Sequence, residues 1–228
     1  MSFPIVHLRA ADIVACELNL SDKDAASFLL GNLAPDGIHY RTGLAGASHR
    51  DIGEEKKITH LCPPTGELWG RITDNDRWLA EIKKVSLDCP NDYFALGYIM
   101  HVLTDVYNNL TLWKDFRENH PKEAANVYGS NYYREMGALD LQLYQETESE
   151  RILRLLPLAE ARAFPERVTA EEVNAIRDSI LFKNDTAYTQ YEGQPPADTS
   201  RNRYVTAARI REFIDKASGF ALLYLPML

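Results

Sequence analysis

A histidine and an aspartate lie one helical turn apart in the most apolar stretch of this chain. They are His101 and Asp105, within the run GYIMHVLTD at residues 97–105. On an α-helix, residues i and i+4 share a face, so the imidazole and the carboxylate would lie one above the other. Burying two such groups is costly unless a partner compensates them. The pair therefore predicts either a buried hydrogen-bonded couple or two ligands of a divalent metal ion, and the spacing alone does not decide between them.

Further candidate ligands lie on segments that are remote in the sequence. His7 belongs to an expected first helix, Asp36 follows Pro35, and His60 ends a polar stretch. Imidazole nitrogens and carboxylate oxygens are the mixed ligand set that zinc, iron, nickel or manganese accepts. Taken singly, each residue has an ordinary alternative. His7 would be a satisfied core histidine, Asp36 a turn or capping carboxylate, and His60 a solvated loop side chain.

The elements expected to position these residues are helices. Apolar residues recur at helical spacing, and no β-type alternation is long enough for a sheet, so the predicted class is all-α. The expected helices cover residues 4–18, about 22–30, 76–86, 91–109, 130–156, about 170–190 and 203–219. Gly31 is expected to end the second of them, and residues 36–70 to form a long loop. The expectation is one domain, 1–228, with 157–228 as a C-terminal helical extension.

Two local patterns predict where helices begin. Ser21 followed by Asp24, and Thr169 followed by Glu172, have the spacing of a capping box. The remaining histidines outside the candidate site are expected to face solvent; they are His39, His49 and His120.

Composition and charge narrow the class of protein. With 45% hydrophobic and 25% charged residues, the 228-residue chain is typical of globular proteins. A net charge of −8 argues against binding nucleic-acid duplexes through a basic surface. The N-terminus lacks signal-peptide features, and no later run reaches membrane-spanning length. Together with three scattered cysteines, these features lead us to expect a cytoplasmic protein without a membrane span.

The candidate ligands belong to a series of segments that resembles a known family. The segments are PIVHLRAAD at 4–12, FLLGNLAPD at 28–36, KKITH at 56–60 and LGYIMHVLTD at 96–105. In this order they resemble the zinc-dependent phospholipase C family, which is related to the P1/S1 nucleases. The resemblance implies a multi-helix bundle of that type with a metal cluster between its helices.

The resemblance also implies which residues bind metal. The ligands that it implies around one ion are Asp36, His60, His101 and Asp105. His7 would lie near a second ion, with Asp105 able to bridge the two.

The chain departs from this family at three places. It begins with Met1 in place of the tryptophan whose amine binds metal in secreted members, and 106–112 lacks a further histidine. The family's later histidine–glutamate pair has its nearest counterpart in residues 131–140, which offer Glu135 and Asp140 but no histidine. We therefore expect a reduced site of one or two metal ions, with Asp140 or Glu135 as an extra ligand. A buried ion pair is the alternative for Asp140.

The expected chemistry is hydrolysis of a phosphoester by metal-activated water, with zinc as the first choice and nickel, iron or manganese as alternatives. Asp36 or Asp105, where not fully engaged as a ligand, would orient or deprotonate that water. Thr59 and Thr104, each next to an expected ligand, are candidates to fix an imidazole tautomer.

The expected substrate is a small phosphorylated molecule or a phospholipid. The apolar segment 219–228 is expected to dock on the core, with a homo-oligomer contact as an alternative. Two other functions remain open at this point. One is a non-catalytic helical metal-binding protein with a degenerate site, and the other is a nucleotide phosphohydrolase with an HD-like site.

Overall fold

The structure is a computed structural model that describes residues 3–44, 49–67, 69–89, 91–126, 129–181 and 198–225; the side chains of 49–51 are outside this description. Within these residues almost all regular structure is helical, and the only extended pairing is a single bridge between Phe164 and Val168. The prediction of an all-α fold is confirmed.

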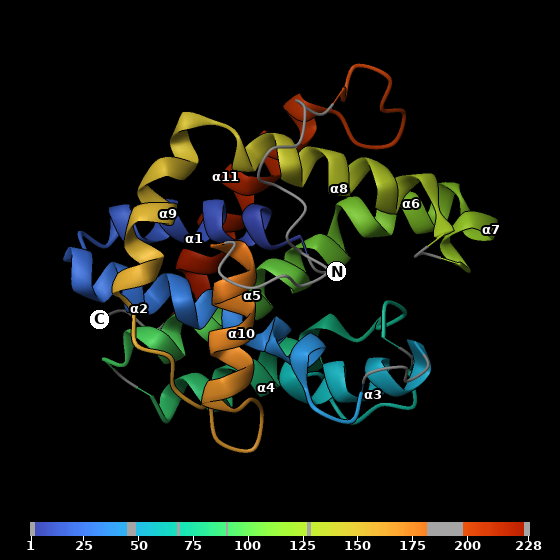
Figure 1. Ribbon diagram of the computed structural model, residues 1–228. Helices are drawn as coiled ribbons and strands as arrows, with labels where there is room; N and C mark the ends of the chain where they lie inside the picture. Colours follow the sequence, from blue (N-terminus) through green and yellow to red (C-terminus); the bar gives the residue numbers. More distant parts are fainter. Residues whose placement is uncertain are drawn as a thin grey trace.

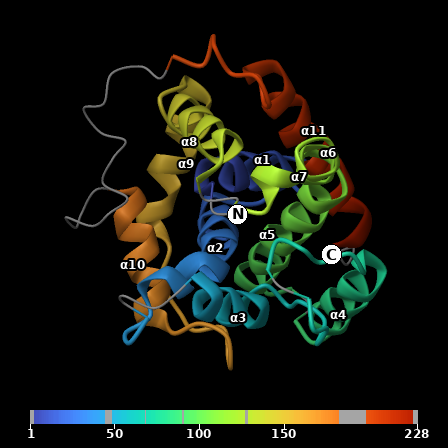
Figure 2. The same ribbon diagram turned by 90° about the vertical axis from the view of Figure 1, so that its right-hand side faces the viewer.

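The helices surround α5, which runs through the middle of the molecule (Figure 1). It packs against α1, α2, α4, α6 and α11. In Figure 2, α3 and α4 lie below α5 and α8 lies above it. In chain order the helices are α1 (Pro4–Glu17), α2 (Asp22–Leu33), the 3₁₀ helix η1 (Ala34–Tyr40), α3 (His49–Thr59), α4 (Asn75–Leu87), α5 (Tyr93–Leu110), α6 (Leu112–Asn119), α7 (Pro121–Ala124), α8 (Asn131–Tyr144), η3 (Thr147–Ser149), α9 (Glu150–Leu155), η4 (Leu156–Leu158), α10 (Ala170–Ile180) and α11 (Ala207–Tyr224).

Side-chain caps begin α2 and α10, as the sequence predicts. The backbone N–H of Asp24 donates to Ser21 Oγ at 3.2 Å. At α10 the capping box is reciprocal, because Glu172 N–H donates to Thr169 Oγ1 at 3.2 Å and Thr169 N–H donates to the Glu172 carboxylate at 3.0 Å. Each cap satisfies backbone donors that the first helical turn leaves without an internal partner.

Two glycines allow α2 and α5 to touch backbone to backbone. A Cβ at Gly31 would lie 1.9 Å from the Phe94 carbonyl oxygen, and a Cβ at Gly97 would lie 1.9 Å from the Phe28 carbonyl oxygen. Gly31 is therefore an interior packing residue of α2, and the prediction that it ends the helix was wrong. The close approach carries Asn32, the next residue of α2, up to the polar face of α5.

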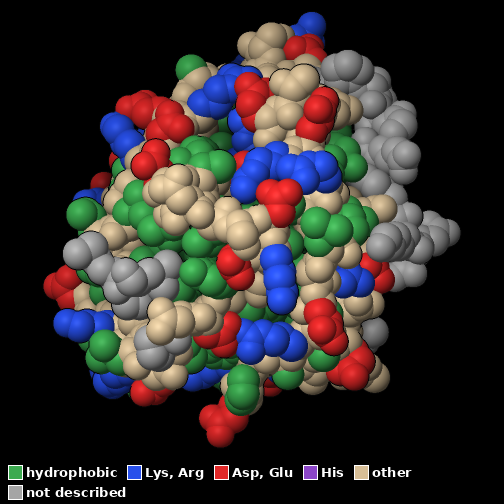
Figure 3. Space-filling model, turned by 90° about the vertical axis from the view of Figure 1, so that its left-hand side faces the viewer, with side chains coloured by type: hydrophobic (Ala, Val, Ile, Leu, Met, Phe, Trp, Pro, Cys, Tyr) green, Lys and Arg blue, Asp and Glu red, His purple; other side chains and the backbone are tan. Residues whose placement is uncertain are grey.

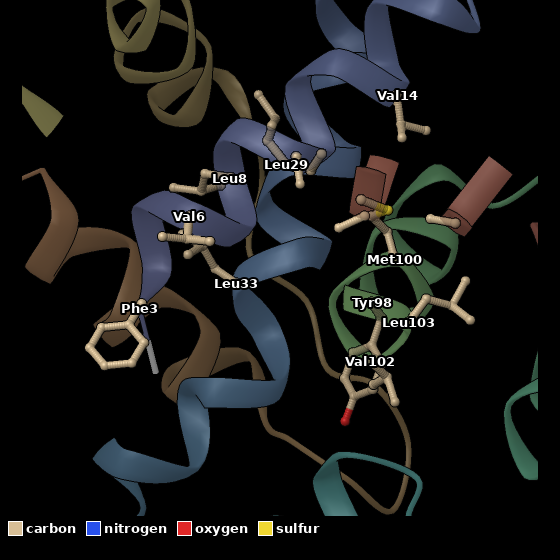
Figure 4. Close-up of a cluster of buried hydrophobic side chains, with 14 of the residues drawn as sticks. Phe3, Val6, Leu8, Val14, Leu29, Leu33, Tyr98, Met100, Val102 and Leu103 are labelled. Atoms are coloured by element: carbon tan, nitrogen blue, oxygen red, sulfur yellow. The ribbon is translucent and has the colours of Figure 1, made fainter. Parts of the chain in front are cut away.

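The core between these helices is apolar and fully enclosed. Figure 4 shows side chains of α1, α2 and α5 meeting in one cluster. Leu8, Leu29 and Val102 are 0% exposed in it. Burial of this kind contributes about 1.5–3 kcal/mol per large aliphatic side chain. The core thus holds the three helices that carry most of the candidate ligands in one fixed arrangement.

The predicted loop at 36–70 was wrong, because it contains most of η1 and the whole of α3. The α3 sequence is too polar to show helical periodicity, but Gly53, Lys56 and Thr59 form a buried stripe along it. The stripe is assembled by tertiary packing of polar and small side chains, which no apolar pattern announces.

Three other boundaries differ from expectation. The helix predicted over 130–156 is interrupted between α8 and α9, where Ser149 Oγ donates to the Leu143 carbonyl at 2.6 Å. α10 ends at Ile180, and residues 182–190 of the expected helix lie outside the described residues. α11 begins and ends later than predicted and packs on α1 and α5.

The surface shows no concentration of one charge on the face in Figure 3, where acidic and basic side chains are interspersed. Among the described helices, none has the length and apolar character required to cross a bilayer.

Candidate metal centre

Five polar side chains from four segments converge beside the middle of α5. All five are predicted ligands, and each is at most 5% exposed; they are His7 on α1, Asp36 on η1, His60 directly after α3, and His101 and Asp105 on α5. His60 is thus a fully buried residue and not the solvated loop side chain that its polar surroundings suggest.

Asp36, His60 and His101 form one group with the spacing of potential ligands around one small cation, and Asp105 lies beside it. The Nε2 atoms of His60 and His101 lie 3.3 Å apart. Asp105 Oδ2 is 3.5 Å from His60 Nε2 and 3.8 Å from His101 Nε2. Asp36 approaches the same two nitrogens, with Oδ1 at 3.5 Å from His60 and Oδ2 at 3.9 Å from His101. Tetrahedral zinc with bonds of about 2.0–2.2 Å separates its ligand atoms by roughly 3.3–3.6 Å.

The tautomers of the two histidines follow from their outer nitrogens. His101 Nδ1 lies 2.7 Å from the Asn32 carbonyl oxygen, and His60 Nδ1 lies 2.9 Å from the Lys56 carbonyl oxygen. A carbonyl can only accept, so each Nδ1 carries the proton and donates it. The Nε2 atom of each neutral ring then presents a lone pair to the centre of the cluster.

Burial keeps both rings neutral. Loss of solvent lowers the pKa of His60, despite the opposing charges of Asp36 and Asp105. Burial and the neighbouring His7 lower the pKa of His101 well below its usual value. Two nitrogen lone pairs and two carboxylates therefore face one another in a space without solvent. A cation shared by these acceptors would stabilise the arrangement, because acceptor atoms that face one another repel.

Both carboxylates are ionised in this surrounding. Burial alone would raise the pKa of Asp36, but the charge of Lys56, whose Nζ lies 2.8 Å from Oδ1, holds it well below its usual value. Burial would likewise raise the pKa of Asp105, but nearby positive charge and the contact with His7 outweigh it and hold the pKa below its usual value. The centre therefore offers two negative charges as well as two nitrogens to a metal ion.

His7 lies on the other side of Asp105. Its Nε2 is 3.5 Å from Asp105 Oδ1, and its ring stacks on that of His101 with centroids 3.9 Å apart and an interplanar angle of 8°. Asp105 thus directs Oδ1 toward His7 and Oδ2 toward His60 and His101. His7, His101 and Asp105 form a second group of potential metal ligands, which shares His101 with the group of Asp36, His60 and His101.

Asn32 joins the three central helices at this point. Its carbonyl accepts from His101 Nδ1. Its side-chain amide, oriented to suit its neighbours, donates to the His7 carbonyl at 3.2 Å and accepts from the His101 backbone N–H at 3.1 Å. The sequence analysis did not identify Asn32. The residue is fully buried, and in the sequence it is a single polar residue between the apolar segments FLLG and LAPD.

His60 is held directly by Thr59 and Trp78, and Tyr98 holds Thr59 in turn. Thr59 Oγ1 lies 2.9 Å from His60 Nδ1, so this predicted contact is present. Trp78 Nε1 donates to the His60 carbonyl at 2.8 Å, and the Tyr98 hydroxyl donates to the Thr59 carbonyl. The other residue predicted to contact a ligand is Thr104. Its Oγ1 instead donates to the Met100 carbonyl within α5.

A buried lysine is the main feature that the sequence analysis missed. Lys56 is 2% exposed, and its Nζ lies 2.8 Å from Asp36 Oδ1 and 3.1 Å from His39 Nε2. The Lys56 ammonium also lies over the Trp69 ring, 5.2 Å from its centroid. His39 was expected to face solvent, but it is half-buried and 3.6 Å from Asp36. The sequence feature that could have identified Lys56 is its spacing of four residues from His60. This spacing is informative only once residues 49–59 are known to be helical.

Two further histidines, His49 and His120, were predicted to face solvent, and the structure describes the side chain of only one of them. His120 is exposed, as expected. The side chain of His49 lies outside the described residues.

Asp140 and Glu135 serve backbone groups. Among the described residues neither belongs to a cluster of potential metal ligands. Asp140 is buried, and its Oδ1 accepts the Val6 N–H of the first turn of α1 at 2.9 Å. The carboxylate of Glu135 accepts the N–H groups of three consecutive residues before α11, 203–205, at 2.8–3.2 Å. The structure gives both residues roles as caps of chain segments.

Comparison of the chain with protein-family models, with curated proteins and with solved structures finds no match.

Proposed function

We propose that this protein is a metal-dependent hydrolase of phosphoester bonds, with a helical bundle of the phospholipase C and P1 nuclease type. The metal ion, zinc as first choice, is held by Asp36, His60, His101 and Asp105. The single observation that carries the proposal is the convergence of two unprotonated Nε2 atoms and two ionised carboxylates in a buried space. Neutral imidazole and carboxylate together are a zinc ligand set. Soft ions such as Cu(I) prefer sulfur ligands, and hard ions such as Mg²⁺ and Ca²⁺ prefer oxygen ligands alone.

The chemistry follows from the charge at this place. A divalent ion bound there lowers the pKa of a water molecule toward about 7 and neutralises charge that develops on a phosphoryl oxygen. Asp105 is suited to orient that water or to accept a proton from it. Its Oδ1 faces His7, whereas its Oδ2 faces His60 and His101. The carbonyls of Asn32 and Lys56 fix both imidazoles in the ligating tautomer, as outer partners of metal ligands commonly do.

The phosphoester assignment rests on the resemblance of four ordered segments to the phospholipase C family. His7 and the two groups of converging ligands are compatible with that resemblance. The acidic chain favours a small phosphorylated substrate or a phospholipid over a nucleic-acid duplex.

One observation favours a second function, which is binding of metal without turnover. The five ligand side chains are 0–5% exposed. Structural zinc sites are closed by protein ligands, whereas catalytic sites keep one position open to water and substrate. A closed site would make the ion a structural element of the fold.

Metal analysis followed by activity assays tests the proposal and separates these two functions. The protein is stripped with a chelator and titrated with Zn²⁺, Mn²⁺ or Ni²⁺, and the bound metal is measured by mass spectrometry. A nitrophenyl monoester, a nitrophenyl diester and nitrophenyl phosphorylcholine are then assayed with each ion. We expect Zn²⁺ to bind and to support hydrolysis of at least one ester.

The assay includes His101→Ala and the control His120→Ala, which removes an exposed histidine. Hydrolysis that His101→Ala abolishes and His120→Ala retains supports the hydrolase. Bound metal without any hydrolysis supports the second function, and absence of bound metal contradicts both.

A further inference from the structure

We propose that the ammonium of Lys56 takes the place of a second metal ion beside Asp36, so that the centre holds a single divalent ion. The inference rests on the proposed function insofar as that function requires a metal ion. It assigns a role to Lys56, which forms no part of the ligand set.

The position of Lys56 is that of a bound cation. Its Nζ lies between Asp36 Oδ1, at 2.8 Å, and His39 Nε2, at 3.1 Å. These two atoms lie 3.6 Å apart, a spacing that ligands of one ion also have. The Trp69 ring covers the ammonium from a further side. Lys56 therefore occupies a point at which an ion would be bound by a carboxylate oxygen and an imidazole nitrogen, apart from the group of His7, His101 and Asp105.

The position is also fixed by the helix that carries it. Lys56 lies one turn before His60, and its own carbonyl accepts from His60 Nδ1. The backbone that places the ammonium thus also sets the tautomer of a proposed ligand. A side chain that is 2% exposed and held in this way cannot move aside without disturbing His60.

The charge balance leads to the same conclusion. With neutral imidazoles, Asp36 and Asp105 supply two negative charges, and Lys56 with one divalent ion supplies three positive charges. The cluster then carries a net charge of one, which a single anionic ligand balances. A second divalent ion would raise the net charge to three in a buried space, where like charges repel strongly.

Metal stoichiometry and affinity test this role. Lys56→Met removes the charge and retains an unbranched side chain of similar length. Lys57→Met is the matched control, because it removes the same charge one residue away, where Lys57 Nζ contacts the Glu67 carbonyl and the Glu54 carboxylate outside the cluster. Stripped wild type and both variants are titrated with Zn²⁺ by calorimetry in the presence of a competing chelator, and folding is checked by circular dichroism.

We expect wild type and Lys57→Met to bind one equivalent with similar affinity. We expect Lys56→Met to bind its first equivalent at least ~10-fold more tightly, because a buried positive charge near the ion has been removed. Two equivalents in wild type, or equal or weaker binding by a folded Lys56→Met, would overturn the inference while leaving metal binding intact. Absence of binding in wild type would instead remove the proposed function and this inference with it.

Should Lys56→Met not fold, Lys56→Gln and the wild type keep the inference testable. Lys56→Gln keeps a donor toward Asp36, and the same increase in affinity is expected from it. In zinc-soaked wild-type crystals, anomalous scattering should show no ion between Asp36 and His39. A peak at that point would overturn the inference.

Discussion

Two kinds of buried carboxylate occur in this molecule. Asp140 directs its Oδ1 at the Val6 N–H, a donor that the first turn of α1 leaves without an internal partner. Asp36 and Asp105 instead direct oxygens at His60 and His101, whose facing nitrogens carry lone pairs. Both kinds are almost completely buried. What differs is the polarity of the groups opposite them.

This difference separates a carboxylate that serves a backbone donor from carboxylates that face potential metal-ligand nitrogens, one of which, Asp36, also pairs with Lys56. A carboxylate opposite backbone N–H groups completes the fold by itself. A carboxylate opposite other acceptors is stable only with a cation between them. Burial therefore does not distinguish a metal ligand from a cap, whereas the identity of the opposing atoms does. The predictions below test the two sides of this comparison.

The largest effect is expected from His101→Ala. It removes one of the two nitrogens from the proposed metal centre and should weaken Zn²⁺ binding by ~100-fold or more, since even loss of an outer partner costs 10–100-fold. Calorimetric titration of the stripped protein measures this loss. Retention of wild-type affinity would show that His101 belongs to a hydrogen-bonded couple instead.

The other side of the comparison is tested by Asp140→Ala. This change leaves the buried Val6 N–H without its acceptor and should lower the free energy of unfolding by about 2 kcal/mol. Urea denaturation of the metal-free protein measures it. The affinity for Zn²⁺ should change by less than about threefold. Asp140 lies outside the groups of potential ligands, so the charge that is lost acts on the ion only from a longer distance. A loss of metal binding comparable with that of His101→Ala would make Asp140 a ligand after all.

The acceptor cluster also predicts a pH dependence for the metal-free protein. The pKa values of His60 and His101 lie below 6.5 in the folded state, so the unfolded chain binds more protons as the pH falls through 6.5. The free energy of unfolding should therefore be highest above pH 6.5 and decrease below it, with a further loss below pH 3.8 as Asp36 and Asp105 are protonated.

Urea denaturation at several pH values between 4.5 and 8 checks this behaviour. His101→Ala should have a smaller decrease between pH 6.5 and 5 than wild type. Stability that is constant or rises on acidification across this range would contradict neutral imidazoles in the centre.

The smallest effect is expected from Glu135→Gln. Its carboxylate accepts three backbone N–H groups before α11, and the neutral amide oxygen retains part of these contacts. A loss of about 1 kcal/mol in the free energy of unfolding is expected, because charge-assisted hydrogen bonds become neutral ones. Metal content should be unchanged, and a fall in bound Zn²⁺ would place Glu135 with the ligands.

The sequence was informative where chemistry and local spacing coincide. His101 and Asp105 are four residues apart in an apolar helix, so their shared face could be predicted from helical geometry alone. The capping residues Ser21 and Thr169 were predictable for the same reason, since a cap and its donor are three residues apart. His7 and Asp36 could be named as candidates from their residue types, but only the resemblance of ordered segments grouped them with His101 and Asp105, because nothing local distinguishes them.

The remainder depends on contacts between distant segments. Lys56 was missed because α3 is polar and its buried side is defined by η1 and α5. Gly31 was mistaken for a helix end because its function, close contact with the Phe94 carbonyl, lies 63 residues away in sequence. Asp140 and Asp36 are both buried carboxylates, and only their partners in three dimensions separate a cap from a candidate ligand.

Anomalous diffraction from zinc-soaked crystals tests the central claim most directly. Data collected on both sides of the zinc absorption edge should show an ion within about 2.2 Å of His60 Nε2 and His101 Nε2, with carboxylate oxygens of Asp36 and Asp105 completing its ligands. The contradictory result would be the same four side chains in the same positions with no anomalous peak between them, at a zinc concentration that occupies sites elsewhere on the protein.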